Sequence, residues 1–344
     1  MKTIVTGGAG FIGSHLVKKL LTLGREVVII DDLSMGSQVN LDDLDIGLDV
    51  EKVDAREYTE VMDVMRGAGT VFHLAARVGS INYLHGNNHR ELQALQSNLA
   101  IDANIFRICL ESRVGKLVYA SSSAVYPIDM QQKANVVLSP ESLKYYNPEG
   151  GYGWSKLLGE IQLGWMPSLS VGIARIFNCY GENMHLGEHT HAIPDLIRKA
   201  IRYPDEDFVV WGNGKQSRDF LYVSDCVNAL LELENNANHR SLIVNVGSGK
   251  PVTVASIAEN IVAISGKNMR IIYDPSRPVG PVSRTADISQ TKALLDWEPK
   301  VDFYEGLSRT YAWVESRLNK AKVPIYQNLK KKRQVRHDYI AAGN

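Results

Sequence analysis

Short apolar runs alternate with amphipathic segments along the first half of the chain. Apolar residues are concentrated in the runs that we interpret as buried strands, which are 2–8, 25–32, 50–55, 70–76, 116–120 and 169–181. Apolar residues recur instead at helical spacing in 9–24, 58–69, 91–112 and 151–166. Buried strands that alternate with helices predict an α/β fold with a doubly wound parallel sheet and right-handed crossovers.

The alternation breaks after Gly181. Two short strands flank the dipeptide Asn213–Gly214, which is typical of a tight turn, and they predict a hairpin within 207–223. The run 241–247 is apolar enough to return to the first sheet. Helical spacing is found in three further segments, which are 191–201, 225–234 and 253–265.

These changes of pattern divide the chain into two domains and a tail. With 344 residues the chain exceeds the usual size of one core. We expect 1–180 to form the first domain, rejoined by part of 208–250. Residues 181–318 are expected to form mainly a smaller α/β lobe. Residues 319–344 form a basic C-terminal tail, for which a solvated terminus is the simplest interpretation.

Composition and charge favour a small-molecule partner. Lys+Arg (38) and Asp+Glu (38) cancel, so no global field favours nucleic acid or a membrane surface. The three cysteines are far apart in the sequence, which argues against a disulfide framework or a structural zinc site, and we expect no metal. No apolar leader and no run of 18 apolar residues is visible, so we expect a cytoplasmic protein.

A glycine-rich turn follows the first predicted strand. Gly7, Gly10 and Gly13 lie between this strand and a helix, where glycine lets the backbone approach a pyrophosphate at the helix N-terminus. Asp31 ends the next strand, 18 positions after Gly13. A carboxylate at this place accepts hydrogen bonds from both hydroxyls of the adenosine ribose, and it repels a 2′-phosphate. The alternatives are tight packing for the glycines and a turn former at Asp31. Together these residues predict a Rossmann domain that binds NAD rather than NADP.

Candidate catalytic residues follow in a serine cluster and on a later helix. The predicted strand 116–120 ends at Ser121–Ser122–Ser123, and Tyr152 and Lys156 are four positions apart on one helix face. A nearby ammonium and a cationic nicotinamide would favour the phenolate and lower the pKa of Tyr152, so that it could act as a base. The alternative is an ordinary solvated helix face.

The motifs in their order resemble those of one enzyme family. "TGGAGFIG", "DDL", "FHLAA", "YASSSAVYP", "YGWSK", "RIFNCYG", "QSRDFLYVSD" and "ADISQTKALLDWEP" occur with the spacing of the extended short-chain dehydrogenases/reductases. The chain resembles their NAD-dependent epimerase/dehydratase family, which acts on nucleotide sugars. The resemblance runs from residue 1 to about residue 318. Among its branches, the motifs are most similar to those of GDP-mannose 3,5-epimerases and UDP-hexose 4-epimerases.

The resemblance implies roles for individual residues. It implies a catalytic triad of Ser122, Tyr152 and Lys156, with Ser123 as a competing choice for the hydroxyl. The smaller lobe is expected to be mainly the substrate lobe, and the substrate, a nucleotide sugar, would be bound by Ser123, Asn178, His191, Arg218 and Arg284. A surface ion pair is the alternative interpretation for the two arginines. The cofactor NAD would be held by Gly7, Gly10, Phe11, Ile12, Gly13, Asp31, Asp54, Ala55, Ala75, Ala76, Arg77, Asn98, Tyr152 and Lys156.

Ala124 narrows the expected reaction. The family's 4,6-dehydratases carry an Asp-Glu pair where this chain has Ser123 and Ala124, and the decarboxylases of nucleotide-linked glucuronate carry a glutamate at the position of Ala124. The 3,5-epimerases carry a cysteine there and a lysine where His191 stands. A methyl group cannot act as an acid or a base. We therefore expect a 4-epimerase of a UDP- or GDP-linked hexose or hexuronate.

Other functions remain open at this level. One is a GDP-mannose 3,5-epimerase-like enzyme, and others are a nucleotide-sugar dehydratase, a simple dehydrogenase or reductase, and a non-catalytic NAD-binding regulator. The resemblance also implies a homodimer, formed through a four-helix bundle of the helices at 91–112 and 151–165.

Overall fold

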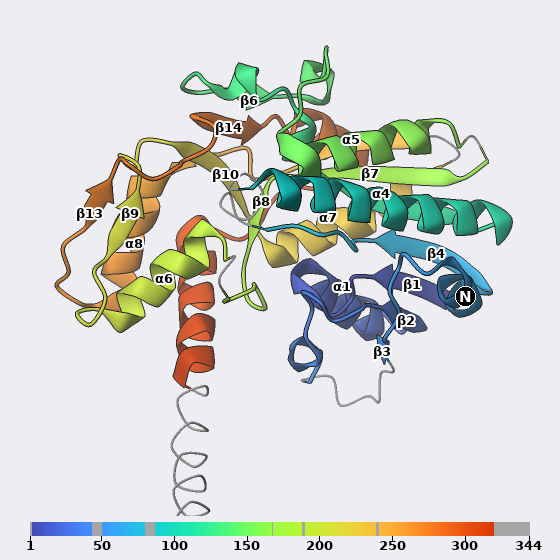
Figure 1. The fold of residues 1–344 in the computed structure, drawn as a ribbon, viewed down its shortest axis with the longest axis horizontal. Coiled ribbons are helices and arrows are strands. Elements are labelled where there is room, and N and C mark those ends of the chain that lie inside the picture. The colour runs from blue at the N-terminus through green and yellow to red at the C-terminus, as the bar shows by residue number, and fades with distance from the viewer. Residues whose placement is uncertain are drawn as a thin grey trace, which may run out of the picture.

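A parallel sheet forms the centre of the first domain in this computed structural model (Figure 1). The structure describes residues 2–42, 50–79, 87–166, 168–187, 190–238 and 241–319. Within these ranges seven strands are paired in the order β11-β7-β5-β4-β1-β2-β3, all of them parallel. Their bounds are β1 Lys2–Thr6, β2 Val27–Ile30, β3 Val50–Glu51, β4 Ala68–His73, β5 Lys116–Ser122, β7 Ser170–Ile176 and β11 Ser241–Val246.

Helices cover both faces of this sheet, as a doubly wound fold requires. Ile4 and Val5 are adjacent in β1 and point to opposite faces, so they belong to different clusters of buried side chains. The Val5 cluster includes α1 Phe11–Thr22 and α7 Val223–Asn236. The Ile4 cluster includes α2 Tyr58–Met65, α4 Asn88–Glu111 and α5 Gly150–Gly164. The predicted Rossmann-type α/β fold is therefore confirmed.

The strand order places a switch point beside β1. The chain runs from β1 outward to β2 and β3, and then returns to β4 on the other side of β1. The connection after β1 therefore runs toward β2, whereas the connection after β4 runs the other way, toward β5. A crevice forms between these two connections, outside the carboxyl ends of β1 and β4. The ends of β5 and β7 lie along the same edge, because all these strands are parallel. Residues that follow these strands are thereby brought together.

A second lobe packs beside this edge and consists of two smaller sheets with their own helices (Figure 1). Its strands are β6 Val137–Leu138, β8 Asn178–Tyr180, β9 Val209–Trp211, β10 Ser217–Tyr222, β12 Pro251–Thr253, β13 Ile272–Asp274 and β14 Ser283–Ala286. Its helices are α6 Ala192–Arg202, α8 Val254–Ser265 and the helical segment 303–319, whereas α9 Ser289–Leu295 packs against α7 and β11 of the first domain. Short 3-10 turns are η1 Gln38–Asn40, η2 Ser123–Val125, η3 Asp129–Gln131 and η4 Pro140–Ser142.

Two predictions about strands were wrong. The expected hairpin within 207–223 does not form, because β9 pairs with β13, whereas β10 pairs with β8, β12 and β14. Gly212 and Gly214 both have positive φ angles and carry the chain from one small sheet to the other. The run 169–181 is divided at Phe177 into β7, in the large sheet, and β8, in the second lobe. The run 241–247 does return to the large sheet, as β11.

Candidate active site

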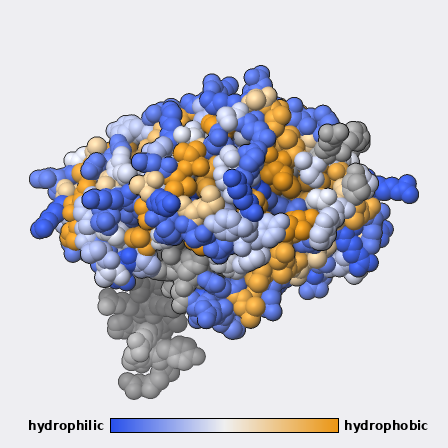
Figure 2. All heavy atoms as spheres, turned by 90° about the horizontal axis from the view of Figure 1, so that it is seen from above, coloured by the Kyte–Doolittle hydropathy of each residue, from blue (hydrophilic) through white to orange (hydrophobic). Residues whose placement is uncertain are grey.

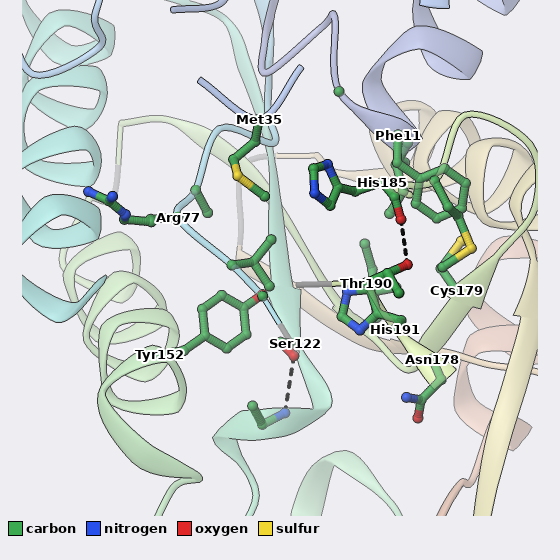
Figure 3. A pocket seen from close by; sticks show the side chains of 18 of the residues that line it. Phe11, Met35, Arg77, Ser122, Tyr152, Asn178, Cys179, His185, Thr190 and His191 are labelled. Carbon is green, nitrogen blue, oxygen red and sulfur yellow. Dashed lines mark hydrogen bonds between the residues drawn. The ribbon is translucent and has the colours of Figure 1, made fainter. Parts of the chain in front are cut away.

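A cavity of about 970 Å³ extends from the carboxyl edge of the large sheet into the second lobe (Figure 3). This volume is in the range of small-molecule sites. Of the residues that the sequence assigned to the site, Asn98 alone does not line the cavity. The others are Gly7, Gly10, Phe11, Ile12, Gly13, Asp31, Asp54, Ala55, Ala75, Ala76, Arg77, Ser122, Ser123, Tyr152, Lys156, Asn178, His191, Arg218 and Arg284. Their individual roles remain predictions.

The glycine-rich turn leaves no room for side chains. Gly7 has a φ angle of +70°, and a Cβ atom there would lie 2.9 Å from the backbone nitrogen of Ala75. A Cβ atom on Gly13 would lie 2.0 Å from the carbonyl oxygen of Gly7. The first turn of α1 therefore packs directly on the glycine-rich turn. This close backbone packing fits a pyrophosphate at the helix N-terminus.

Asp31 lies at the end of β2 and is 7% exposed. Its Oδ2 accepts a hydrogen bond from the N–H of Ala9 at 2.9 Å, and its Oδ1 accepts one from the N–H of Leu33 at 2.9 Å. Burial raises the pKa of this carboxyl, and the two backbone donors oppose the rise. Asp31 therefore stabilises the glycine-rich turn and also presents a carboxylate to the cavity.

Replacing Asp31 is expected to change the choice between NAD and NADP. In an Asp31→Asn variant the affinity for NAD should fall by about tenfold or more, because the two charge-assisted hydrogen bonds to the ribose are weakened. The affinity for NADP relative to NAD should rise, because the 2′-phosphate is no longer repelled. Calorimetric titration with both dinucleotides measures the ratio, and an unchanged ratio would contradict the role given to Asp31.

Asn98 supports the site from outside the cavity. It lies on α4 and is 1% exposed. Its Oδ1 accepts a hydrogen bond from the N–H of Arg77 at 2.6 Å, and its Nδ2 donates to the carbonyl oxygen of Arg77 at 3.1 Å and to Ser155 Oγ at 3.1 Å. Asn98 thus links the backbone of Arg77, which follows β4, to helix α5. This helix carries Tyr152 and Lys156.

Arg56 is a cavity residue that the sequence analysis did not identify. Its Nη2 lies 2.5 Å from Asp54 Oδ2, and this hydrogen bond is the main reason why the pKa of Asp54 is lowered. Asp54 and Arg56 are only two positions apart, so the pair could have been found from the sequence as a local acid–base pair after β3.

The three serines after β5 have different partners. Ser121 Oγ donates to Glu160 Oε1 at 2.5 Å, on the buried side of α5. Ser123 Oγ lies 3.3 Å from Arg284 Nη1, from which it accepts a hydrogen bond. Ser122 Oγ accepts one from the N–H of Ala124 at 3.2 Å, and of the three serines it is the one whose hydroxyl is near enough to lower the pKa of Tyr152. Ser122 is therefore the serine whose hydroxyl meets the tyrosine.

Tyr152 points from α5 into the cavity, on the same side as Ser122 (Figure 3). Burial raises the pKa of its hydroxyl to about 12, and the neighbouring Ser122 hydroxyl only partly opposes this. The chain's own groups therefore do not produce the lowered pKa that the sequence analysis predicted. The phenol is protonated at neutral pH, and a positive charge in the cavity would be needed to favour the phenolate.

Lys156 lies one turn further along α5 and is 2% exposed. Its Nζ is 4.6 Å from the centre of the Tyr119 ring, a cation–π contact that fixes the end of the side chain. Burial lowers the pKa of Lys156, whereas the negative charges of Asp102 and Glu160 act in the opposite direction. Lys156 thus lines the cavity one helical turn after Tyr152.

Two buried arginines lie side by side at the second lobe's end of the cavity. Arg218 and Arg284 are paired in register on β10 and β14 and are 8% and 6% exposed, so the alternative of a surface ion pair is wrong. Arg284 forms a buried ion pair with Glu149 at 2.5 Å. Within the described ranges Arg218 donates to two carbonyl oxygens, those of Ser217 and Val279, at 2.7 and 3.0 Å.

Positive charge is concentrated at this end. Burial and the neighbouring Arg284 lower the pKa of Arg218 to about 10. Among the described residues, no carboxylate lies within ion-pair distance of Arg218. Glu149 was not identified from the sequence, although it lies only three positions before Tyr152, because its partner Arg284 is 135 positions away. Arginines in this arrangement fit a diphosphate.

Asn178 and His191 complete the wall opposite Tyr152 (Figure 3). Asn178 Oδ1 is buried and has no hydrogen-bond partner among the described residues. An unpaired buried acceptor is costly, and a ligand hydroxyl in the cavity would satisfy it. His191 is accessible from the cavity, but the surrounding protein atoms desolvate it and, together with His185, lower its pKa. His191 is therefore neutral at neutral pH.

The described residues contain neither a metal-binding cluster nor a membrane-spanning helix. No group of three or more His, Cys, Asp or Glu side chains in these ranges is arranged to hold a metal ion. Of the predicted basic tail at 319–344, residues 320–344 lie outside the described residues. In the same part of the chain, no helix has both the length and the apolar character to cross a membrane.

The fold and the site together define a dinucleotide-binding enzyme with a tyrosine–lysine pair beside a second, substrate-sized compartment. Residues 3–247 match the model of the NAD-dependent epimerase/dehydratase family, and the chain belongs to this family. NAD is therefore its cofactor. The resemblance seen in the sequence motifs is confirmed.

Relatives with different reactions are about equally similar to the chain. A UDP-N-acetyl-alpha-D-glucosaminuronate decarboxylase of Bacillus cytotoxicus is 29% identical, and the match covers 91% of this chain and 97% of the relative. GDP-mannose 3,5-epimerase 1 of Oryza sativa subsp. japonica is also 29% identical, over 94% of this chain and 84% of the relative. The structure of UDP-glucose 4-epimerase from Thermotoga maritima with UDP-glucose superposes with a TM-score of 0.83 at 25% identity, covering 92% of this chain and 100% of that one.

Proposed function

We propose that this protein is a nucleotide-sugar 4-epimerase that acts through a transient 4-keto sugar, on a UDP- or GDP-linked hexose or hexuronate. The observation that carries the proposal is Ser122, Tyr152 and Lys156 at one cavity wall with Ala124 beside them. Ala124 is buried and offers neither an acid nor a base. Dehydration, decarboxylation and 3,5-epimerisation in this family are expected to need such a group at that position, whereas 4-epimerisation is not.

The triad would move one proton in each direction. Tyr152, as the phenolate, takes the proton of the sugar's 4-hydroxyl, while Ser122 holds the oxygen through a hydrogen bond. When bound, NAD supplies a reversible acceptor for the hydride of C4. The 4-keto sugar then rotates in the cavity, so that the hydride returns to the opposite face of C4. Tyr152 returns the proton to the 4-oxygen. Lys156 favours the phenolate by its positive charge, and no net oxidation results.

The contacts along the cavity suggest an order for the parts of the substrate. The sugar would lie at Tyr152, and the diphosphate at the paired arginines Arg284 and Arg218. Arg218 donates to the carbonyl oxygen of Val279, which in turn lies beside Gly212. Trp211 directly precedes Gly212 in the chain and also lines the cavity. We propose that the nucleotide base stacks on its ring. Positive charge between an aromatic wall and the tyrosine supports a nucleoside diphosphate sugar as the ligand.

His191 supports a second candidate, a 3,5-epimerase. It lies in the cavity on the wall opposite Tyr152, at the position where the resemblance places a lysine in GDP-mannose 3,5-epimerases (Figure 3). A neutral imidazole can take a proton from a carbon next to a 4-ketone. The cysteine partner of that lysine is replaced by Ala124, however, so a group to return the proton on the other face is lacking at this position.

Turnover in deuterium oxide separates these reactions. A panel of UDP-, GDP-, dTDP- and CDP-linked hexoses and hexuronates is incubated with the enzyme, and the products are analysed by NMR. We expect inversion at C4 with no deuterium at C3, C4 or C5, because the hydrogen of C4 returns from the cofactor. Deuterium at C3 or C5 would instead establish a 3,5-epimerase.

The same experiment tests the remaining alternatives. A simple dehydrogenase would accumulate reduced cofactor in proportion to its product, which the nicotinamide absorbance detects. A 4,6-dehydratase would release a 4-keto-6-deoxy sugar. A non-catalytic regulator would bind NAD and convert none of the panel, and this result would remove the proposal altogether.

The proposal includes a homodimer through α4 and α5. These two helices pack against each other along their length. Leu92 on α4 and Trp154 on α5 are large apolar side chains that are 50% and 40% exposed. Figure 2, which views the molecule from above Figure 1, shows apolar patches between hydrophilic residues on the upper face of the molecule. A second copy that paired these helices in a four-helix bundle would bury such side chains.

A further inference from the structure

A chain of buried polar groups runs behind the cavity wall, from the glycine-rich turn to the region of Lys156. The N–H of Ala75 donates to Thr6 Oγ1 at 3.2 Å, and Thr6 Oγ1 lies 2.7 Å from Nδ1 of His73. His73 Nε2 lies 3.0 Å from Asp102 Oδ1. Burial lowers the pKa of His73, so the imidazole is neutral. The proton on Nε2 then points to Asp102, and Nδ1 accepts from Thr6.

Asp102 is therefore a buried carboxylate whose hydrogen-bond donors carry no charge. It is 1% exposed, and its second oxygen accepts a hydrogen bond from the Tyr119 hydroxyl at 2.8 Å. Lys156 Nζ lies over the ring of this same Tyr119. An ionised carboxylate with only neutral donors is costly to bury, and a nearby cation repays part of that cost.

Glu160 is the other carboxylate near Lys156, but its charge is already compensated. Arg175 binds it with both Nε and Nη2, at 3.0 and 2.7 Å, in a buried ion pair. Ser121 donates a further hydrogen bond to it. Five titratable groups thus surround Lys156. The carboxylate of Glu160 is compensated and that of Asp102 is not, the imidazole of His73 is neutral, and the remaining two groups are the phenols of Tyr119 and Tyr152.

The fold leaves space for this arrangement at Gly159. A Cβ atom there would lie 2.3 Å from the Tyr119 hydroxyl oxygen and 2.8 Å from Asp102 Oδ2. The absence of a side chain lets α5, which carries Lys156, pack directly on the Asp102–Tyr119 pair of α4 and β5. Any larger residue would push the ammonium-bearing helix away from the carboxylate.

We propose that Asp102 is a positioning residue, the buried counter-ion that holds Lys156 as a cation beside Tyr152. The inference relies on the proposed function only for what Lys156 does in turnover. Asp102 does not touch the cavity and acts through Tyr119 and Lys156. Through His73 and Thr6 the same carboxylate is linked to the Ala75 backbone, so the lysine is tied to the loop that lines the cofactor end of the cavity.

An NMR titration of the lysine tests this directly. The full-length protein with NAD bound carries lysine labelled with ¹³C at Cε, and the Lys156 signal is the one lost in Lys156→Met. In Asp102→Asn its titration midpoint should fall by about one pH unit, because an opposite charge has been removed from a buried amine. Asp225→Asn is the matched control, because Asp225 is also buried but bonds the backbone of Lys300 and Val301. The control should leave the midpoint unchanged.

Thermal unfolding provides a second measurement that needs no turnover. Asp102→Asn should lower the midpoint temperature less in a Lys156→Met background than in the wild type, because no buried cation is then left without its partner. If Asp102→Asn alone does not fold, the variant that combines Asp102→Asn with Lys156→Met should still show a folded fraction.

Equal effects in both backgrounds, or an unshifted lysine titration in folded Asp102→Asn, would overturn the proposal. The expected shifts in a protein that converts no nucleotide sugar would support the role of Asp102 and remove the proposed function alone.

Discussion

Replacing Tyr152 by phenylalanine should lower kcat by about a thousandfold, since general acid–base catalysis typically contributes between 10² and 10⁴. The variant loses only the hydroxyl that meets Ser122 and keeps the ring that lines the cavity. NAD should still bind, because the glycine-rich turn and Asp31 are untouched. Steady-state kinetics on the substrate found in the panel measures the loss, and calorimetry measures the affinity for NAD.

The pKa of Tyr152 shows what its role as a base requires. Burial keeps its hydroxyl protonated at neutral pH in the absence of a positive ligand charge, so the charge of the bound cofactor is needed before Tyr152 can act as a base. Tyr145→Phe is the matched control, because Tyr145 is exposed and donates to Asp129 outside the cavity. It should retain wild-type kinetics. Turnover by Tyr152→Phe above about a tenth of the wild-type rate would refute the proposed mechanism.

The second large effect is expected from Gly13→Ala. The added Cβ atom would lie 2.0 Å from the carbonyl oxygen of Gly7 and 2.8 Å from Cα of Gly8. Both neighbours are backbone atoms, so the turn itself must move. We expect the affinity for NAD to fall by at least about a hundredfold, because the turn then no longer fits against the pyrophosphate. Overpacking of this kind also lowers the free energy of unfolding by about 1–3 kcal/mol.

Gly164→Ala separates this steric effect from the general effect of the substitution. Gly164 is the last residue of α5, and a Cβ atom there would meet nothing within 4 Å. Alanine should therefore leave stability unchanged or raise it slightly, and NAD should bind as in the wild type. Titration calorimetry and thermal unfolding of both variants give the comparison. If Gly13→Ala bound NAD like Gly164→Ala, the proposed position of the pyrophosphate would be wrong.

Much of the first domain could be predicted from the sequence because its signals are local. The apolar strands, the turn from Gly7 to Gly13, Asp31 at the end of β2 and the four-residue spacing of Tyr152 and Lys156 all lie within short segments. Parallel pairing then brings the strand ends to one edge. A family resemblance added Asn178, Arg218 and Arg284, which no local pattern distinguishes from surface residues.

The sequence by itself determined the alternation of strands and helices, the dinucleotide turn and the tyrosine–lysine pair, because residues close in the chain encode them. The tertiary structure alone decided how β9 and β10 pair, which serine meets Tyr152, and that Arg284 contacts Ser123, 161 positions away. It also decided that protein groups raise the pKa of Tyr152 rather than lower it. Strand partners, burial and charge balance depend on segments far apart in the sequence, and only the folded chain brings these together.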